Sequence, residues 1–407
     1  MSDRARVRPW RMLVTALAAL LAVPVVLVAA PADPSAASSG PYDYPVDPGT
    51  PAWEAFTNHA QMVAATQIPA TVLATMSTQD LITSVLDYPL YGDRWAFNSP
   101  REGFDVMASR FDGIPALYAR PDAATALLDR YTSMTTAASA DPGSANEQIA
   151  DLEALIAQAP VLLAEMTSAQ LNNLVLVGTD WLEAMQSSPE VATPTGEETT
   201  LLLLGRATYT LLNTSWTGND FLATGLAAST DTLDDVEAAV YERAVVPDAT
   251  DGISQTRGYH STVRTPNGTS VPVLVMTYEL SSSDIARFNK YVESRYPRAT
   301  RETNASRKYN CHSYAWYSQS TSNNRWMNSP GDNAYWEDGS YLRWHPPLVS
   351  KYNMRASYVH GDHSALNPNK GGQIYHSKWG QLPRMMHAWD YSPYDDSTME
   401  WYYRAGT

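Results

Sequence analysis

The feature of this sequence that most limits its fold is a change of pattern near residue 245. From residue 51 to about residue 244, apolar side chains recur at helical spacing and strand signals are nearly absent. After residue 251 the chain alternates polar and apolar side chains over residues 259–264, and residues 271–278 are rich in β-branched types. The pattern predicts an α+β protein: an all-α multi-helix domain over residues 51–245, followed by an α+β domain over residues 252–407.

Local signals agree with this division. Ser77 precedes an apolar helical face and is a predicted N-cap, and residues 148–162 place apolar side chains near a 3.6-residue period. The acidic side chains of Asp231, Asp234 and Asp235 are typical of the first turn of a helix. In the second domain, Asn267 and Gly268 predict a hairpin turn, and Ser283 predicts the start of another helix.

The N-terminus predicts export. Four arginines between residues 4 and 11 precede an apolar run over residues 13–30, and Ala30-Pro31-Ala32 follows as a cleavage pattern. We therefore expect a signal peptide over residues 1–32, a linker over residues 33–50, and a secreted or extracellular protein. The apolar run is also long enough to cross a bilayer, so an uncleaved N-terminal anchor is the alternative. We expect no other membrane contact.

The single cysteine of the chain, Cys311, is the strongest chemical candidate. One cysteine excludes an internal disulfide and a cysteine-rich zinc site. Helical spacing after Cys311 predicts that it opens a helix, where the helix dipole and the nearby Arg307 and Lys308 favour a thiolate. Two interpretations stay open: a nucleophile, or a buried structural thiol.

A nucleophilic thiol needs a base and an orienting group. Residues 363–366 and 373–380 predict two strands of a hairpin, which would place His363 and His376 side by side. We therefore predict Cys311, His363 and His376 as the catalytic residues. The oxyanion would be held by the backbone N–H of Cys311 with either the Tyr309 hydroxyl or the Asn310 amide.

Three short motifs carry a resemblance: NCHSYAW at residues 310–316, DHSA at 362–365 and SKWG at 377–380. They resemble the papain-like cysteine amidases and peptidases of the CHAP and NlpC type, within a little-characterised family of exported bacterial proteins. The resemblance implies a papain-like fold for the second domain, with Cys311 as nucleophile, His363 as base and His376 as the third member. It also implies a cysteine hydrolase that cleaves amide or peptide bonds through an acyl-thioester, with cell-wall peptide as one candidate substrate.

Other histidines supply two alternative sites. His260 lies on a predicted strand upstream of the cysteine, and some permuted papain-like relatives place the base there. A cluster of His360, Asp362, His363 and His387 would offer ligands to a divalent metal, although the spacing suits this poorly. We expect no metal and no cofactor.

A non-catalytic function is the alternative from another class. Seven of the twelve tryptophans lie after residue 310, so the second domain is either a protein with an aromatic-filled core or a secreted binding or adhesion module for glycan or protein. Asp332, Glu337 and Asp338 lie in a segment rich in glycine and asparagine, which is typical of turns rather than of a glycosidase site.

Charge differs sharply between the two domains. Residues 33–250 carry 7 basic and 29 acidic side chains, whereas residues 251–407 carry 17 and 13. The acidic balance of the whole chain, −15, argues against nucleic acid as a partner. Two interpretations of the asymmetry remain: the acidic helical part docks on the slightly basic part and restricts access to Cys311, or the acidic residues serve solubility.

Overall fold

The computed structural model describes residues 40–138, 146–187, 193–213, 245–247, 254–256, 258–345, 353–368 and 372–406. The predicted signal peptide, residues 33–39 of the predicted linker and the predicted helix start at residues 231–235 lie outside these residues. Contacts group Ala37–Thr407 as one unit, so the helical and the α+β parts pack together. Within the described residues, none of the helices is long and apolar enough to cross a membrane.

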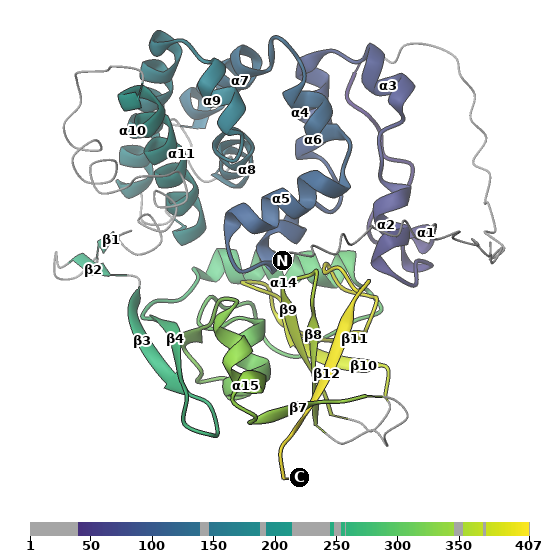
Figure 1. Cartoon of the computed structure of the whole chain (residues 1–407). Coiled ribbons are helices and arrows are strands. Elements are labelled where there is room, and N and C mark those ends of the chain that lie inside the picture. Colours follow the sequence, from purple (N-terminus) through teal and green to yellow (C-terminus); the bar gives the residue numbers. More distant parts are fainter. Residues whose placement is uncertain are drawn as a thin grey trace, which may run out of the picture. The chain divides into compact units, whose positions relative to one another are not determined.

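The described residues 40–213, called the helical half below, contain helices and no strand, as predicted (Figure 1). The helices are α1 Pro51–Glu54, α2 His59–Ala65, α3 Ala70–Thr75, α4 Thr78–Leu86, η1 Tyr91–Ala96, α5 Pro100–Arg110, α6 Gly113–Tyr118, α7 Ala123–Ala138, α8 Asn146–Ala157, α9 Pro160–Glu165, α10 Ser168–Gln186 and α11 Pro194–Asn213. The N-cap predicted at Ser77 is confirmed, because its side chain accepts from the Asp80 N–H. The helix predicted over residues 148–162 is instead two helices, since Pro160 has no N–H to continue α8 and begins α9.

The described residues 258–406, called the α+β half, follow two short strands. The elements after the helical half are β1 Val245–Pro247, β2 Ser254–Thr256, β3 Gly258–Arg264, β4 Ser270–Met276, α14 Ser282–Arg295, β5 Thr300–Arg301, η4 Ser313–Tyr317, β6 Arg325–Trp326, η5 Gly331–Asn333, α15 Ala334–Glu337, β7 Tyr341–Arg343, β8 Met354–Tyr358, β9 His363–Asn367, β10 Ile374–Lys378, β11 Arg384–Ala388 and β12 Met399–Arg404. The turn predicted at Asn267 and Gly268 joins β3 and β4. Helix α14 begins two residues earlier than predicted, because Ser281 rather than Ser283 caps the Asp284 N–H.

Seven antiparallel strands form the main sheet of the α+β half, in the order β5-β11-β10-β9-β8-β12-β7, and β3, β4 and β6 form a second sheet. One face of the main sheet contacts the turn η4: the Trp316 Nε1–H donates to Ser364 Oγ at 2.9 Å, and the Arg355 Nε–H donates to Ala315 O at 2.5 Å. On the other face, the Tyr296 ring that follows α14 packs edge-on against Trp379 at 4.8 Å. Because side chains alternate along a strand, the sheet presents two distinct buried faces.

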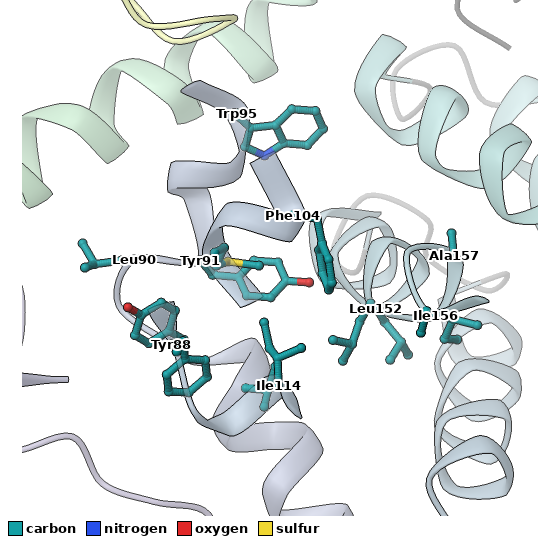
Figure 2. Close-up of a cluster of buried hydrophobic side chains, with 14 of the residues drawn as sticks. Tyr88, Leu90, Tyr91, Trp95, Phe104, Ile114, Leu152, Ile156 and Ala157 are labelled. Atoms are coloured by element: carbon teal, nitrogen blue, oxygen red, sulfur yellow. The ribbon is translucent and has the colours of Figure 1, made fainter. Parts of the chain in front are cut away.

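The core of the helical half continues into the α+β half. Figure 2 shows part of this core, including Tyr91, Phe104 and Ile114, each at most 4% exposed. Helix α14 joins the two halves, because the buried Trp53 donates its Nε1–H to Arg295 O at 2.8 Å.

A second junction lies just after β10. The Gln381 N–H donates to Trp95 O at 2.9 Å. Gly380 precedes it with φ +49°, and a Cβ there would lie 2.5 Å from the backbone of Trp95 and Ala96. Only glycine allows this approach. The end of η1 is thereby fixed against the edge of the α+β half that carries Cys311.

Candidate active site

Cys311 opens a helical segment, as predicted. Residues 311–312 are α-helical and lead directly into η4, where the Ser318 N–H bonds to Ser313 O five residues back, a π-helical geometry that is frequent at functional sites. The thiol is buried, with Cys311 only 1% exposed. Its Sγ lies 3.8 Å from Oδ1 of Asn98, which belongs to the segment between η1 and α5. The helical half therefore contributes directly to the surroundings of the thiol.

Two asparagines hold each other beside the thiol. The Asn310 Nδ2 amide donates to Asn98 Oδ1 at 2.8 Å and to Met327 O at 2.6 Å, while its Oδ1 accepts from the N–H groups of Met327 and Ser313. Both hydrogens of the Asn310 amide are thus engaged. The predicted oxyanion role of this amide is therefore replaced by a positioning role, because it orients the side chain of Asn98.

Tyr309, the other predicted oxyanion donor, faces elsewhere. Its hydroxyl is hydrogen-bonded to Thr303, and its ring lies 5.4 Å from Nζ of Lys378. The Lys378 ammonium is itself buried and donates to three backbone carbonyls. These contacts with Thr303 and Lys378 give Tyr309 a structural role rather than a role in binding the oxyanion.

His312, the residue after the cysteine, lies in a dense polar cluster. Its Nδ1 is 2.9 Å from Ser364 Oγ and 3.0 Å from Asp332 Oδ2. Its Nε2 is 3.5 Å from Asp362 Oδ1 and 3.2 Å from Asn98 Nδ2. Asn98 also donates to Asp362 Oδ2 at 2.8 Å. One asparagine side chain therefore touches the thiol of Cys311, the imidazole of His312 and a carboxylate.

The charges in this cluster are strongly coupled. Burial alone would lower the pKa of His312, but electrostatic interaction with Cys311 and Asp332 and the hydrogen bonds to Asp332 and Asp362 outweigh it and raise that pKa well above 6.5. Burial would raise the pKa of Asp362, but the hydrogen bond and charge of His312 lower it to about 2. Burial and the nearby Asp362 raise the pKa of Glu102, on α5, to about 7. The cluster therefore holds an imidazolium beside the thiol.

His363 begins strand β9, as predicted, but the structure does not bring it into hydrogen-bonding contact with Cys311. Its neighbour Ser364 faces η4, so strand alternation directs His363 to the opposite face of the sheet. There its ring stacks on Tyr394 at 3.5 Å and meets Tyr358 edge-on at 5.1 Å. Neither ring nitrogen of His363 has a hydrogen-bond partner in the described part of the chain.

The predicted pairing of His376 with His363 is wrong. The register of β9 and β10 places His376 opposite Leu366, three positions from His363 and with the opposite side-chain direction. The Nδ1 of His376 lies 2.7 Å from Glu302 Oε1, and the other oxygen of Glu302 accepts from Arg384 at 3.0 Å. His376 thus belongs to a half-buried ion-pair group at the side of β5 and β11.

The other histidines considered as alternative sites lie apart from one another. His260 is exposed on β3, in the second sheet. His387 bonds to Ser377 Oγ and lies near its neighbouring carbonyl, whereas Asp362 faces His312, so the histidines weighed as metal ligands do not converge. Within the described ranges, no group of three His, Cys, Asp or Glu side chains is placed to hold a metal ion.

Sequence reasoning did not assign any residue to His312. Asp362, inside the DHSA motif, was considered only as a metal ligand, and Asp332 was set aside because the composition of its segment is typical of a turn. Asn98 has no local signal, since it lies 213 positions before Cys311 along the chain.

Comparison of the chain with protein-family models, with curated proteins and with solved structures found no match.

Proposed function

We propose that this protein is a cysteine hydrolase that cleaves amide or peptide bonds through an acyl-thioester on Cys311, with a papain-like α+β half. The observation that supports the proposal best is the buried thiol beside a histidine whose ring is held by two carboxylates. A structural thiol needs no such neighbour. Burying so many polar groups costs stability, so their presence around the thiol indicates a purpose other than stability.

In the proposed mechanism Cys311 and His312 act as a thiolate–imidazolium pair. The thiolate attacks the carbonyl carbon of the substrate amide, and His312 gives its proton to the nitrogen of the leaving amine as the carbon–nitrogen bond breaks. The neutral imidazole then takes a proton from water, whose oxygen attacks the thioester carbonyl, so the carboxylic acid is released and the thiolate–imidazolium pair is restored. Asp332 orients the ring from the Nδ1 side.

Access to the thiol is restricted in this arrangement. Cys311 is 1% exposed, and Asn98 covers its Sγ from the helical half. In the proposed mechanism the side chain of Asn98 moves away from Sγ when a substrate carbonyl binds. This supports the interpretation in which the helical half limits access to Cys311. For substrate we keep the class, amides and peptides, with cell-wall peptide as the first candidate because export is expected from the N-terminus.

The proposal is tested by trapping the acyl-enzyme. The full mature chain is incubated with a panel of fluorogenic peptide amides and with peptidoglycan, and intact mass is measured after rapid acid quench. We expect an added acyl mass on Cys311 and released amine in the wild type, and neither in Cys311→Ala. The exposed His360 supplies the matched control variant, His360→Ala, which should behave as wild type.

Two results would overturn the proposal. One is full turnover in Cys311→Ser together with a thiol that is inert to iodoacetamide in the folded protein. The other is binding of peptidoglycan or protein with no turnover on any substrate of the panel, which would favour the secreted binding module. Far-UV circular dichroism of each variant shows whether lost activity reflects lost fold.

Secretion is proposed on the N-terminal pattern alone. Expression of the full chain in a bacterial host, followed by N-terminal sequencing of the protein found in the medium, should place the first residue near position 33. Recovery of the intact N-terminus in the membrane fraction would instead support the uncleaved anchor.

A further inference from the structure

A second site lies away from Cys311. A cavity of about 690 Å³ opens beside β8, β10 and β12, within the size range of small-molecule sites. Three tryptophans (Trp344, Trp389 and Trp401), together with Tyr375, form its aromatic walls, and Asp396 contributes a carboxylate. We call it the tryptophan cavity.

The tryptophan cavity is on the sheet face opposite to η4. Tyr375 precedes His376 on β10, and His376 pairs with Leu366, which shares the direction of Ser364 toward η4. Alternation therefore directs Tyr375 to the other face. Trp401 lies with it, since its Nε1–H donates to the Tyr375 hydroxyl at 2.9 Å. The cavity is thus separated from the cysteine site by the sheet itself.

The aromatic walls form a corner rather than a flat platform. The rings of Trp344 and Trp401 are 6.2 Å apart and inclined at 86°. All three tryptophans of the cavity are partly exposed, whereas Trp316 and Trp379 are buried in the core. Partly exposed aromatic rings gathered around one hollow indicate a binding site. Two perpendicular ring faces suit a compact, rounded group, and the faces of indole rings attract cations.

The charge of the cavity points to the same class of ligand. Asp396 lines the cavity and has no ion pair within the residues that the structure describes. Burial raises the pKa of Asp396, and the nearby Asp390 carboxylate raises it further, with His59 acting in the opposite sense. A cation bound against the tryptophans would offset this concentration of negative charge.

We propose that the tryptophan cavity binds a small quaternary ammonium compound, with its cationic head between Trp344 and Trp401 and its charge facing Asp396. A neutral sugar would stack on the aromatic surface and donate a hydroxyl to the carboxylate, but it would leave the negative charge of the carboxylate uncompensated. The site is independent of the hydrolase proposal, since it shares no residue with the cluster around Cys311.

The test is calorimetric titration of the full mature chain with choline chloride, beside its neutral isostere 3,3-dimethylbutan-1-ol and sodium chloride. We expect saturable binding of choline and none of the isostere. Trp344→Ala and Asp396→Asn should each weaken choline binding by about tenfold, since cation–π and charge contacts in a partly buried site have this size. The matched controls are Tyr259→Ala and Asp105→Asn, which remove an exposed aromatic ring and an exposed carboxylate elsewhere.

The proposal is overturned if choline and its neutral isostere bind equally, or if choline gives no heat beyond that of sodium chloride. It is also overturned if chitotriose saturates the site in a Trp344-dependent way while choline does not, because the ligand class would then be a saccharide. Unchanged thermal melting of both cavity variants ensures that a loss of binding reports the cavity. Activity at Cys311 in these variants should equal that of wild type.

Discussion

His312 and His363 are both 1% exposed and lie toward opposite faces of one sheet, yet their surroundings are chemical opposites. The ring of His312 is surrounded by a hydroxyl, an amide and two carboxylates. The ring of His363 stacks on Tyr394, and both its nitrogens lack a partner in the described part of the chain. Burial, followed by the charges of His387 and His312, lowers the pKa of His363 well below 6.5.

The difference shows that a place in a motif does not decide what a histidine does. His363 stands where a papain-like base is expected along the chain, but its environment holds a neutral ring in an aromatic layer. His312 lies inside the NCHSYAW motif without a predicted role, but its environment holds a charged ring on the residue next to Cys311. The partners of the ring, not its position in the sequence, set its ionisation.

The largest expected effect comes from removing one imidazole at a time. His312→Gln should lower amide hydrolysis by about 100-fold or more, the usual size of a lost acid–base group, whereas His363→Phe should stay within about threefold of wild type. Steady-state rates on a fluorogenic amide measure both. The reverse ranking would return the role of base to His363 and break the comparison.

Stability separates the two rings as well. Removing His312 leaves the buried Asp332 uncompensated, which typically costs about 3–5 kcal/mol, whereas His363→Phe replaces one neutral ring by another and should cost less than about 1.5 kcal/mol. Urea unfolding at pH 6 measures these values. Equal losses in the two variants would mean that His312 carries no net charge in the fold.

The two histidines should respond to pH in opposite directions. The folded pKa of His312 lies above 6.5, so its stabilising effect is present below that pH and is lost as pH rises through the folded value. The folded pKa of His363 lies below 6.5, so stability is lost as pH falls from 6.5 toward that value. A tenfold difference in proton affinity between the folded and the unfolded chain corresponds to about 1.4 kcal/mol of unfolding free energy.

Unfolding free energies from pH 4 to pH 9 test this sign. His363→Phe should flatten the acid side of the wild-type profile, and His312→Gln should flatten the alkaline side. His387, whose burial lowers its pKa to about 4, remains in both variants and so cancels in the difference. If the unfolding free energy of His363→Phe fell at acid pH as much as that of the wild type, the assignment of a neutral ring to His363 would be contradicted.

A smaller effect is expected for Asn98, whose side chain lies against the thiol. Asn98→Ala removes the side chain that lies 3.8 Å from Sγ, so iodoacetamide should reach Cys311 a few times faster while hydrolysis falls. Opposite changes in access and turnover would be hard to obtain from unfolding alone. The control is Asn289→Ala, which removes a hydrogen bond between two other asparagines, Asn289 and Asn304. It should change neither the alkylation rate nor the hydrolysis rate.

The smallest effect is expected at His376. Its pair with Glu302 is about 20% exposed on each side, so His376→Ala should cost at most about 1 kcal/mol and leave hydrolysis within twofold. Thermal melting and the fluorogenic assay measure this. A loss comparable to that of His312→Gln would restore His376 to the catalytic residues.

Local pattern predicted much of the framework. Ser77 as a cap, the turn at Gly268, the cysteine at the start of a helical segment and His363 at the start of a strand all follow from neighbours within a few residues. Such features depend on capping, turn geometry and periodicity, which are written in short stretches of sequence.

The cluster around the thiol could not be predicted in the same way. The register that separates His376 from His363 depends on how two strands align, and a shift of one residue reverses every side chain. The partnership of His312 with Asp332 and Asn98 depends on tertiary contacts across 20 and 214 positions. No periodic pattern encodes these distances.

The separation of Asn98 from Cys311 along the chain also bears on how the protein is made. At typical rates of synthesis, on the order of ten to forty seconds pass between the two residues leaving the ribosome. The helical half, whose described residues end at Asn213, leaves the ribosome before α14 and before Gln381, against which Trp53 and Trp95 pack. The thiol acquires its neighbours only when the final strands are in place, so a truncated chain carries no assembled cysteine site.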